Sequence, residues 1–279
     1  MTVNSDDGPF AVLGLGLIGG SIARDLAARK ACVLGFDADR HAVNAARRAH
    51  VISRVIDAGL GQLRDARTVI LAAPVDAAID LLTRAAPFLD RATLITDVGS
   101  TKSAIVAHAQ ALGLGDRFVG SHPLAGDHRS GWIASRRALF EGAQVFVCPT
   151  RTSTAATIRR THAFWRSVGA RTLQMAAKAH DAKVAYTSHL PHLLSAALAR
   201  TLERAGHAHS ALGPGGRDVT RLASSSPDMW SAIVGANGPL ISQALTAFAE
   251  ELQLVRRAAA RGNSGAIHEL FTATGDWAS

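Results

Sequence analysis

A glycine-rich turn near the N-terminus constrains the fold of this chain more than any other segment. Gly14, Gly16 and Gly19 have G-x-G-x-x-G spacing, between the apolar run 10–13 and a helical run over 22–29. In such a unit the first glycine allows a tight turn, the second lets a pyrophosphate approach the backbone, and the third lets helix and strand pack closely. The segment predicts a strand–turn–helix unit that binds a dinucleotide.

An acidic residue supports this interpretation. Asp37 ends the strand-like run 32–36, where a carboxylate can accept hydrogen bonds from an adenosine ribose. The same charge would repel a 2′-phosphate, so we expect NAD+ as the cofactor, with NADP+ possible. The expected cofactor-binding residues are Gly14, Gly16, Leu17, Ile18, Gly19, Asp37, Ala73, Pro74 and Ser100.

Short apolar runs alternate with helical segments as far as residue 175, and only helical patterns follow. This order predicts an α/β Rossmann-type, doubly wound sheet of about seven or eight strands, followed by an all-α helical domain. We expect a flexible N-terminus over 1–9, a dinucleotide-binding domain over 10–175, and a helical domain for substrate and dimerisation over 176–279. The expected strands are 10–13, 32–36, 68–74, 94–96, 118–119, 143–148 and 170–175.

The segment 96–126 carries the candidate catalytic residues. Ser100 follows one expected strand and His122 follows the next, so both should lie at the carboxyl edge of the sheet, where ligands bind. An imidazole in that position can take a proton near neutral pH. We therefore interpret His122 as a catalytic base with Ser100 beside it, and the alternative is a histidine that only satisfies a buried turn. The polar segment 127–137 is expected to be helical.

A second polar cluster lies in the helical half. Pro191 falls inside the periodic run 179–204 and predicts a kink or a break. Ser188, His189 and His192 gather around it, and the two histidines share one helical face. Binding of the substrate or of the nicotinamide end of the cofactor is the preferred interpretation, with a structural role as the alternative. A metal site is not favoured, because no carboxylate lies nearby.

An anion site is predicted after a glycine-rich turn at 213–216. Arg217, Asp218 and Arg221 follow it on a short helical segment, and arginine can hold a carboxylate through two parallel hydrogen bonds. Asp218 and Arg221 are three apart and could pair, which would fix the arginine; a plain surface ion pair is the alternative. Trp230 follows and is a further candidate for substrate contact.

Composition excludes several classes. The net charge is +8, but the arginines are scattered and aromatic residues are scarce, so we expect no nucleic-acid partner. No apolar run is expected to span a membrane, and the polar N-terminus does not resemble a signal peptide. Cys32 and Cys148 are expected to be buried thiols. We predict a cytoplasmic protein that binds a small anionic substrate and no metal.

The last long helical run predicts association. Over 240–257 the apolar residues recur at helical spacing and form a broad stripe. A helix of this length commonly buries such a stripe against a second copy of the chain, so we expect a homodimer. The residues of the stripe are Leu240, Ile241, Ala244, Leu245, Phe248, Leu252 and Val255.

Taken together, these motifs resemble the prephenate/arogenate dehydrogenase family of tyrosine biosynthesis. The matching segments, in family order, are 14–21 (GLGLIGGS), 97–102 (DVGSTK), 121–126 (SHPLAG), 188–192 (SHLPH), 215–221 (GGRDVTR) and 229–230 (MW). The resemblance implies NAD(P)-dependent oxidative decarboxylation of a dicarboxylate substrate, a Rossmann domain and a helical dimerisation domain. It also implies His122 as the catalytic histidine, Arg221 as the ligand of a substrate carboxylate, and Trp230 as a residue that a partner subunit can contribute.

One segment departs from the family pattern. Asp127 and His128 follow Gly126, where many relatives carry a hydroxyl residue and then Glu. Both would lie near the substrate side chain, and their altered order leaves prephenate and arogenate as open alternatives, with prephenate preferred. Two other functions remain alternatives: a 3-hydroxyacid-type dehydrogenase that uses Lys183, and a dinucleotide-binding sensor without turnover.

Overall fold

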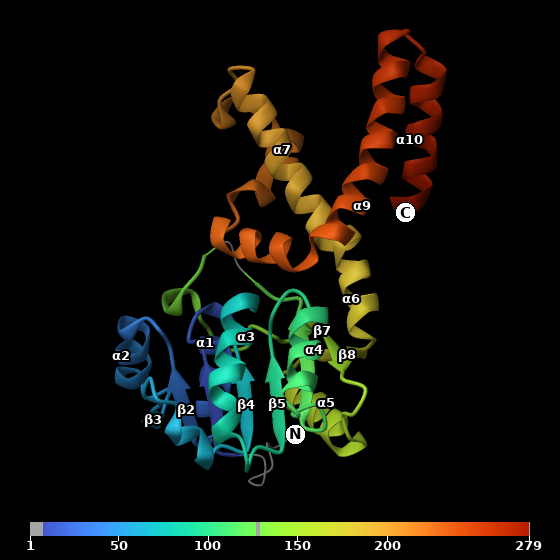
Figure 1. Ribbon diagram of the computed structural model, residues 1–279. Helices are drawn as coiled ribbons and strands as arrows, with labels where there is room; N and C mark the ends of the chain where they lie inside the picture. The colour runs from blue at the N-terminus through green and yellow to red at the C-terminus, as the bar shows by residue number, and fades with distance from the viewer. Residues whose placement is uncertain (1–7, 127–128, 279) are drawn as a thin grey trace.

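The chain folds around one eight-stranded sheet with a helical part above it (Figure 1). The computed structural model describes residues 8–126 and 129–278. The strand order is β3-β2-β1-β4-β5-β6-β7-β8, with all neighbours parallel except β6 and β7. The strands are β1 (Phe10–Leu13), β2 (Val33–Phe36), β3 (Arg54–Val55), β4 (Thr68–Leu71), β5 (Leu94–Asp97), β6 (Phe118–Pro123), β7 (Gln144–Pro149) and β8 (Arg171–Gln174).

Helices cover both faces of this sheet, which is why its central strands are buried along their whole length. Alternate residues of β1 enter different cores, with Phe10 and Val12 on one face and Ala11 and Leu13 on the other. The covering helices are α1 (Leu17–Ala27), α2 (Arg40–Arg48), α3 (Val75–Ala85), α4 (Ser103–Ala111) and α5 (Ala155–Ser167). The predicted doubly wound sheet is therefore confirmed.

Three local predictions were wrong. Strand β6 does not stop at residue 119 but continues to Pro123, because β7 pairs with it antiparallel and extends its ladder. The segment expected to be helical contains, in its described part, only the single 3-10 turn η4 (Trp132–Ala134). Cys32 is exposed, although Cys148 is buried and burial raises the pKa of its thiol to about 12.

After β8 every described element is helical. The elements are α6 (Ala177–Val184), η5 (Ala185–His189), α7 (Leu190–Arg204), η6 (His209–Ala211), α8 (Pro214–Thr220), η7 (Arg221–Ser224), α9 (Pro227–Ala260) and α10 (Ser264–Ala278). Two more 3-10 turns, η2 (Gly61–Asp65) and η3 (Ala86–Phe88), lie in the sheet domain. The domain limits given above stay a prediction.

Pro191 disturbs its helix in a specific way. It has no N–H for a helical bond, and its ring would press on the carbonyl group four residues earlier. The chain widens into the π-helical turn η5 just before it, so α6, η5 and α7 run on without a break. This wide turn carries Ser188 and His189.

Helix α9 is longer than the expected run and is broken within. Asn237 has non-helical φ and ψ of −128° and 16°, two residues before Pro239. By length and composition alone, α9 is the one helix of the described chain that is long and apolar enough to cross a membrane. One face of its N-terminal half packs against the rest of the molecule through Ile233, Asn237 and Ile241. Beyond this half, α9 and α10 project from the body as a helical hairpin (Figure 1).

Candidate active site

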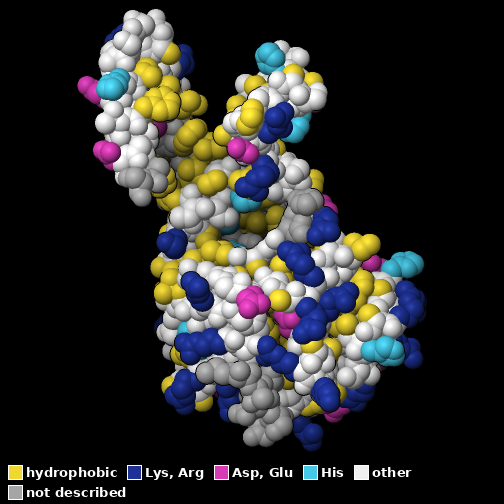
Figure 2. All heavy atoms as spheres, turned by 180° about the vertical axis from the view of Figure 1, so that it is seen from behind, with side chains coloured by type: hydrophobic (Ala, Val, Ile, Leu, Met, Phe, Trp, Pro, Cys, Tyr) yellow, Lys and Arg dark blue, Asp and Glu magenta, His cyan; other side chains and the backbone are white. Residues whose placement is uncertain are grey.

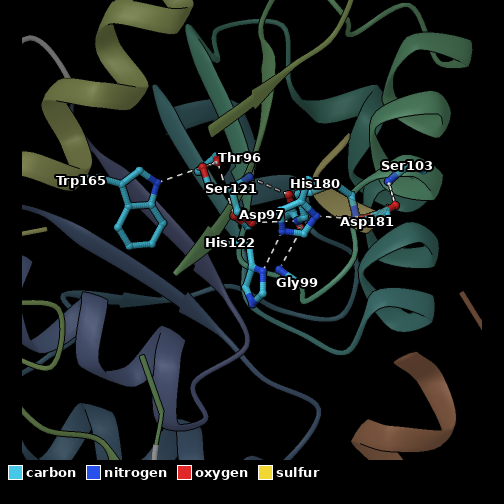
Figure 3. A network of polar contacts seen from close by, with 10 residues as sticks. Thr96, Asp97, Gly99, Ser103, Ser121, His122, Trp165, His180 and Asp181 are labelled. Carbon is cyan, nitrogen blue, oxygen red and sulfur yellow. Dashed lines mark hydrogen bonds and ion pairs between the residues drawn. The ribbon is translucent and has the colours of Figure 1, made fainter. Parts of the chain in front are cut away.

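His122 lies at the end of β6 and begins a chain of hydrogen bonds that reaches the helical part (Figure 3). Its Nδ1 is 2.9 Å from Nε2 of His180, and Nδ1 of His180 is 2.8 Å from Oδ1 of Asp181. His122 is 8% exposed, and His180 and Asp181 are buried in α6. The result is a His–His–Asp chain that links the sheet edge to the first helix after the sheet.

The carboxylate that ends this chain is firmly held. Asp181 accepts hydrogen bonds from the backbone amides of Lys102 and Ser103, each at 2.8 Å. These amides open helix α4, which has no side-chain cap of its own, so Asp181 caps it from another element. Burial raises the pKa of Asp181, but the hydrogen bonds from His180, Ser103 and Lys102 outweigh burial and hold the pKa below its ordinary value. Asp181 is therefore ionised at neutral pH.

A buried ion pair fixes the ends of β5 and β6 relative to each other. The Lys102 ammonium pairs with Asp97 and donates to the Ser121 carbonyl at 2.8 Å. Asp97 also accepts from the Gly99 and Ser121 amides, at 2.8 and 3.1 Å. Since Ser121 directly precedes His122, these bonds help to fix where the His122 ring lies.

The Ser121 side chain ties β6 to the other face of the sheet. Its Oγ is 2.8 Å from Oγ1 of Thr96 on β5 and accepts from Nε1 of Trp165 on α5 at 2.9 Å (Figure 3). Trp165 is fully buried and packs edge-on against Phe140. Hydrogen bonds to β5 and to α5 thus hold the strand residue next to His122 in place.

The imidazole of His122 is suited to accept a proton. Burial lowers its pKa well below the ordinary value, and His180, Lys102 and His189 lower it further, while Asp181 opposes them. At neutral pH the ring is therefore uncharged. No described residue hydrogen-bonds its Nε2. Nδ1 of His122 is thus bonded to His180 on α6, and Nε2 remains available to a ligand.

The helical part contributes a second histidine to the site. His189 is buried, and its Nδ1 is 3.3 Å from the side-chain nitrogen of Asn237, which also donates to the Asp181 carbonyl at 3.0 Å. The His189 and His192 rings lie 5.8 and 4.7 Å from the Trp230 ring. In the described chain, Nε2 of His189 and Nε1 of Trp230 are buried and have no hydrogen-bond partner. Burial lowers the pKa of His189 to about 4.

The glycine turn has the geometry that a dinucleotide requires. Gly14 has φ of +106°, and a Cβ there would lie 2.2 Å from the Ala72 carbonyl oxygen. A Cβ on Gly19 would lie 1.9 Å from the Gly14 carbonyl oxygen, whereas a Cβ on Gly16 would meet no described atom within 4 Å. Chain packing therefore explains Gly14 and Gly19, whereas the backbone at Gly16 is open and leaves room for a ligand.

Other residues expected to bind the cofactor lie next to this turn. Leu17 and Ile18 form the first turn of α1, whose N-terminus has no side-chain cap. Asp37 accepts from the Leu15 amide at 2.5 Å, so it lies against the glycine turn. Ala73 and Pro74 lie between β4 and the start of α3.

Several expected residues are not joined to this site. Ser100 is half-buried and has no hydrogen bond to His122 among the described residues. Ser188 is half-buried on η5, where its carbonyl faces Nδ1 of His192 at 2.8 Å. Asp127 and His128 lie outside the described residues. The described chain holds no group of three residues that could bind a metal ion.

The arginine cluster differs from the prediction. Arg217, Asp218 and Arg221 are all exposed, and no ion pair joins Asp218 to Arg221 in the described chain, because α8 ends at Thr220 and the turn changes to 3-10. Arg217 instead donates to the Leu212 carbonyl at 2.5 Å. Arg221 is therefore free to meet a ligand.

No sequence pattern pointed to His180, Asp181 or Asn237. The only signal for His180 and Asp181 was a polar pair in the first helix after the sheet, and such a pair is common on solvated helices. Asn237 was hidden because its importance depends on the break in α9.

Two family models cover most of the chain. The one described as prephenate dehydrogenase, nucleotide-binding domain, matches residues 22–174. The one described as prephenate dehydrogenase, dimerization domain, matches residues 176–273.

Curated relatives and solved structures agree. Prephenate dehydrogenase of Bacillus subtilis (strain 168) is 34% identical over 253 residues, which are 87% of this chain and 68% of the relative. Cyclohexadienyl dehydrogenase of Zymomonas mobilis is 31% identical over 273 residues, 94% of this chain and 92% of the relative. The crystal structure of prephenate dehydrogenase from A. aeolicus with hydroxyphenyl propionate and NAD+ has a TM-score of 0.88 at 28% identity, covering 95% of both chains. Synechocystis arogenate dehydrogenase has a TM-score of 0.81 at 26% identity, covering 96% of this chain and 97% of the other.

Proposed function

The chain belongs to the prephenate dehydrogenase family, and from this premise we infer that it is an NAD-dependent oxidoreductase that oxidises and decarboxylates prephenate or arogenate in tyrosine biosynthesis. The observation in the structure that carries this proposal is the buried, uncharged His122 at the carboxyl edge of the sheet. The two other functions considered lose support, since Lys183 is exposed and the family is one of enzymes.

The described residues fit the dinucleotide. We propose that the pyrophosphate lies over Gly16 at the uncapped start of α1, and that Asp37 holds the adenosine ribose. Ala73, Pro74 and Ser100, in the loops after β4 and β5, would flank the cofactor. When bound, NAD+ supplies the acceptor for the hydride that leaves the substrate ring carbon.

His122 would manage the proton of the ring hydroxyl. As the hydride leaves, Nε2 accepts that proton and the ring oxygen becomes a carbonyl. The bond to the ring carboxylate then breaks, carbon dioxide leaves, and its electron pair makes the ring aromatic. The phenol oxygen takes the proton back, so no net proton is released and His122 only has to hold one briefly. A buried ring with a lowered pKa suits this temporary role.

A turnover assay tests this function. Purified protein would be given NAD+ or NADP+ with prephenate or with arogenate, and formation of the reduced cofactor and carbon dioxide would be followed. We expect turnover with at least one substrate, and we propose prephenate as the better one. Binding of NAD+ without turnover of either substrate would contradict the enzyme proposal and favour the sensor. A tenfold or greater preference for arogenate that Asp127→Asn abolishes would assign Asp127 to the substrate ammonium.

Cofactor choice gives the first prediction. We expect kcat/KM to be larger for NAD+ than for NADP+, because Asp37 would repel a 2′-phosphate. Asp37→Ser should narrow this difference and also weaken NAD+ binding, since Asp37 supports the glycine turn through the Leu15 amide. The matched control is Asp39→Asn, which removes a nearby charge but keeps the oxygen that caps α2. A larger kcat/KM for NADP+ in the unaltered protein would disprove the prediction.

Substrate binding gives the second prediction. We propose that Arg221 holds a substrate carboxylate, because it is exposed at the start of η7 and no described carboxylate pairs with it. Arg221→Ala should raise the substrate KM by about 10- to 100-fold, the loss of one hydrogen bond to a charged group, with a smaller effect on kcat. Arg166→Ala, on α5, is the control. An unchanged KM would move the anion site to another cation, with Arg217 next.

Association of two copies of the chain gives the third prediction. The match to a dimerization domain supports a homodimer. Ile241 and Ala244 of the predicted stripe are buried within the chain, but Leu252 and Leu254 on α9 and Phe271 on α10 are more than half exposed. Hydrophobic side chains gather on the facing sides of the two helical projections, above a hollow between the helical part and the sheet domain (Figure 2). We propose that a second copy covers this exposed apolar surface.

Light scattering should give twice the mass of one chain at micromolar concentration. Leu252→Asp should shift the protein toward the monomer, because it places a charge in the proposed interface. Leu173→Asp is the control, since Leu173 is exposed to a similar degree on β8, away from these helices. A single-chain mass for the unaltered protein would contradict the dimer.

A further inference from the structure

The hydrogen bonds that link His122, His180 and Asp181 have a fixed donor-to-acceptor direction, because Asp181 can only accept. Asp181 is an ionised carboxylate that already accepts from two backbone amides, so it can only accept at Oδ1 as well. Nδ1 of His180, 2.8 Å away, must therefore carry a hydrogen and donate it.

The tautomer of His180 in turn determines which nitrogen of His122 carries a hydrogen. In its neutral form His180 has one N–H, so donation from Nδ1 then leaves a lone pair at Nε2. That lone pair is 2.9 Å from Nδ1 of His122, which must then carry the hydrogen of this bond. Nε2 of His122 is left with its lone pair exposed to the ligand side.

Packing keeps the rings in this arrangement. Phe146 lies opposite His122 in the β6–β7 register, and its ring is edge-on to His180 with centroids 5.2 Å apart. His180 is itself edge-on to His122, with centroids 5.1 Å apart. His180 is fully buried, so no water competes for its nitrogens.

We propose that His180 and Asp181 are positioning residues that fix His122 in the Nδ1–H tautomer and so place an unprotonated Nε2 at the substrate hydroxyl. The proposal rests on the role of His122 proposed above. With the opposite tautomer, Nε2 would carry a hydrogen toward the substrate and could not accept its proton.

The first test reads the tautomer without any turnover. In protein with ¹⁵N-labelled histidine, NMR correlations between ring nitrogens and ring carbon-bound hydrogens distinguish the two tautomers, and His122→Asn assigns the signal. We expect His122 and His180 both as Nδ1–H. An Nε2–H form of His122 in the unaltered protein would overturn the proposal, whatever the activity.

The second test compares two replacements of one side chain. Gln at 180 can donate to Asp181 through its amide nitrogen and accept from His122 through its oxygen, whereas Leu can do neither. We expect His180→Leu to convert His122 to Nε2–H and lower kcat by about 10²-fold or more, because the base is lost. His180→Gln should keep the Nδ1–H signal and stay within about tenfold of normal kcat.

The control is His162→Gln, since His162 bonds Thr172 and lies outside the chain. If His180→Leu does not fold, the unaltered protein and His180→Gln still decide the proposal. Equal kcat and an unchanged His122 signal in the Leu and Gln variants would overturn it. Absence of turnover in the unaltered protein with an Nδ1–H signal would refute the proposed function but not the positioning.

Discussion

Replacement of His122 by asparagine is expected to lower kcat by about 10²–10⁴-fold and leave NAD+ binding unchanged. Asparagine fills similar space and can still hydrogen-bond to His180, but it cannot take a proton from the ring hydroxyl. The glycine turn that would hold the pyrophosphate belongs to β1 and α1, so its shape does not depend on this side chain. Steady-state kinetics with prephenate and fluorescence titration with NADH would measure the two effects separately.

The pH profile of the unaltered enzyme adds an independent measurement. Burial and the nearby His180, Lys102 and His189 lower the pKa of His122 well below 6.5, despite Asp181. As the proposed base, His122 can accept a proton only above that pKa, so kcat/KM should stay level as pH falls through 6.5 and decline only at lower pH. The control for the His122→Asn substitution is His162→Asn, which also removes a histidine. Near-normal turnover of His122→Asn would remove His122 from the mechanism.

The sheet could be predicted because its strands are local signals. The runs that became β1, β4 and β5 are short, apolar and followed by small residues or turns, so strand and helix alternate visibly in the sequence. Strand β3 could not be found this way, since it has two exposed residues, Arg54 and Val55, and exists only as an edge added to β2. An apolar run predicts a strand but not its direction, so the antiparallel pairing of β7 could not be predicted.

The site was predictable where a motif carries its own geometry. The glycine turn, His122 and the cluster around Pro191 are each defined by residues close in the sequence. The partners of His122 are not, because His180 is 58 residues away and meets it only after the helical part folds back on the sheet edge. Asp181 similarly caps a helix that begins 78 residues earlier. Contacts between distant elements depend on packing, which no single-sequence pattern contains.

Replacement of Lys102 by methionine is expected to destabilise the protein by about 3–5 kcal/mol. The Lys102 side chain is fully buried and the Asp97 side chain is 1% exposed, so neither charge can turn to water when its partner is removed. Methionine keeps much of the volume but leaves Asp97, among the described residues, with only the Gly99 and Ser121 amides. The Ser121 carbonyl also loses its donor.

Urea unfolding would measure the change in free energy, with Lys178→Met as the control because Lys178 is exposed on α6. The double variant Asp97→Asn, Lys102→Met should be more stable than Lys102→Met alone, since it no longer buries an unpaired charge. The ion pair sets the position of Ser121, the residue before His122. Lys102→Met should therefore also lower kcat, and this effect should be larger than any change in KM. A loss of stability no greater than that of Lys178→Met would show that water or another cation reaches Asp97, and that the pair does not hold β5 and β6 in place.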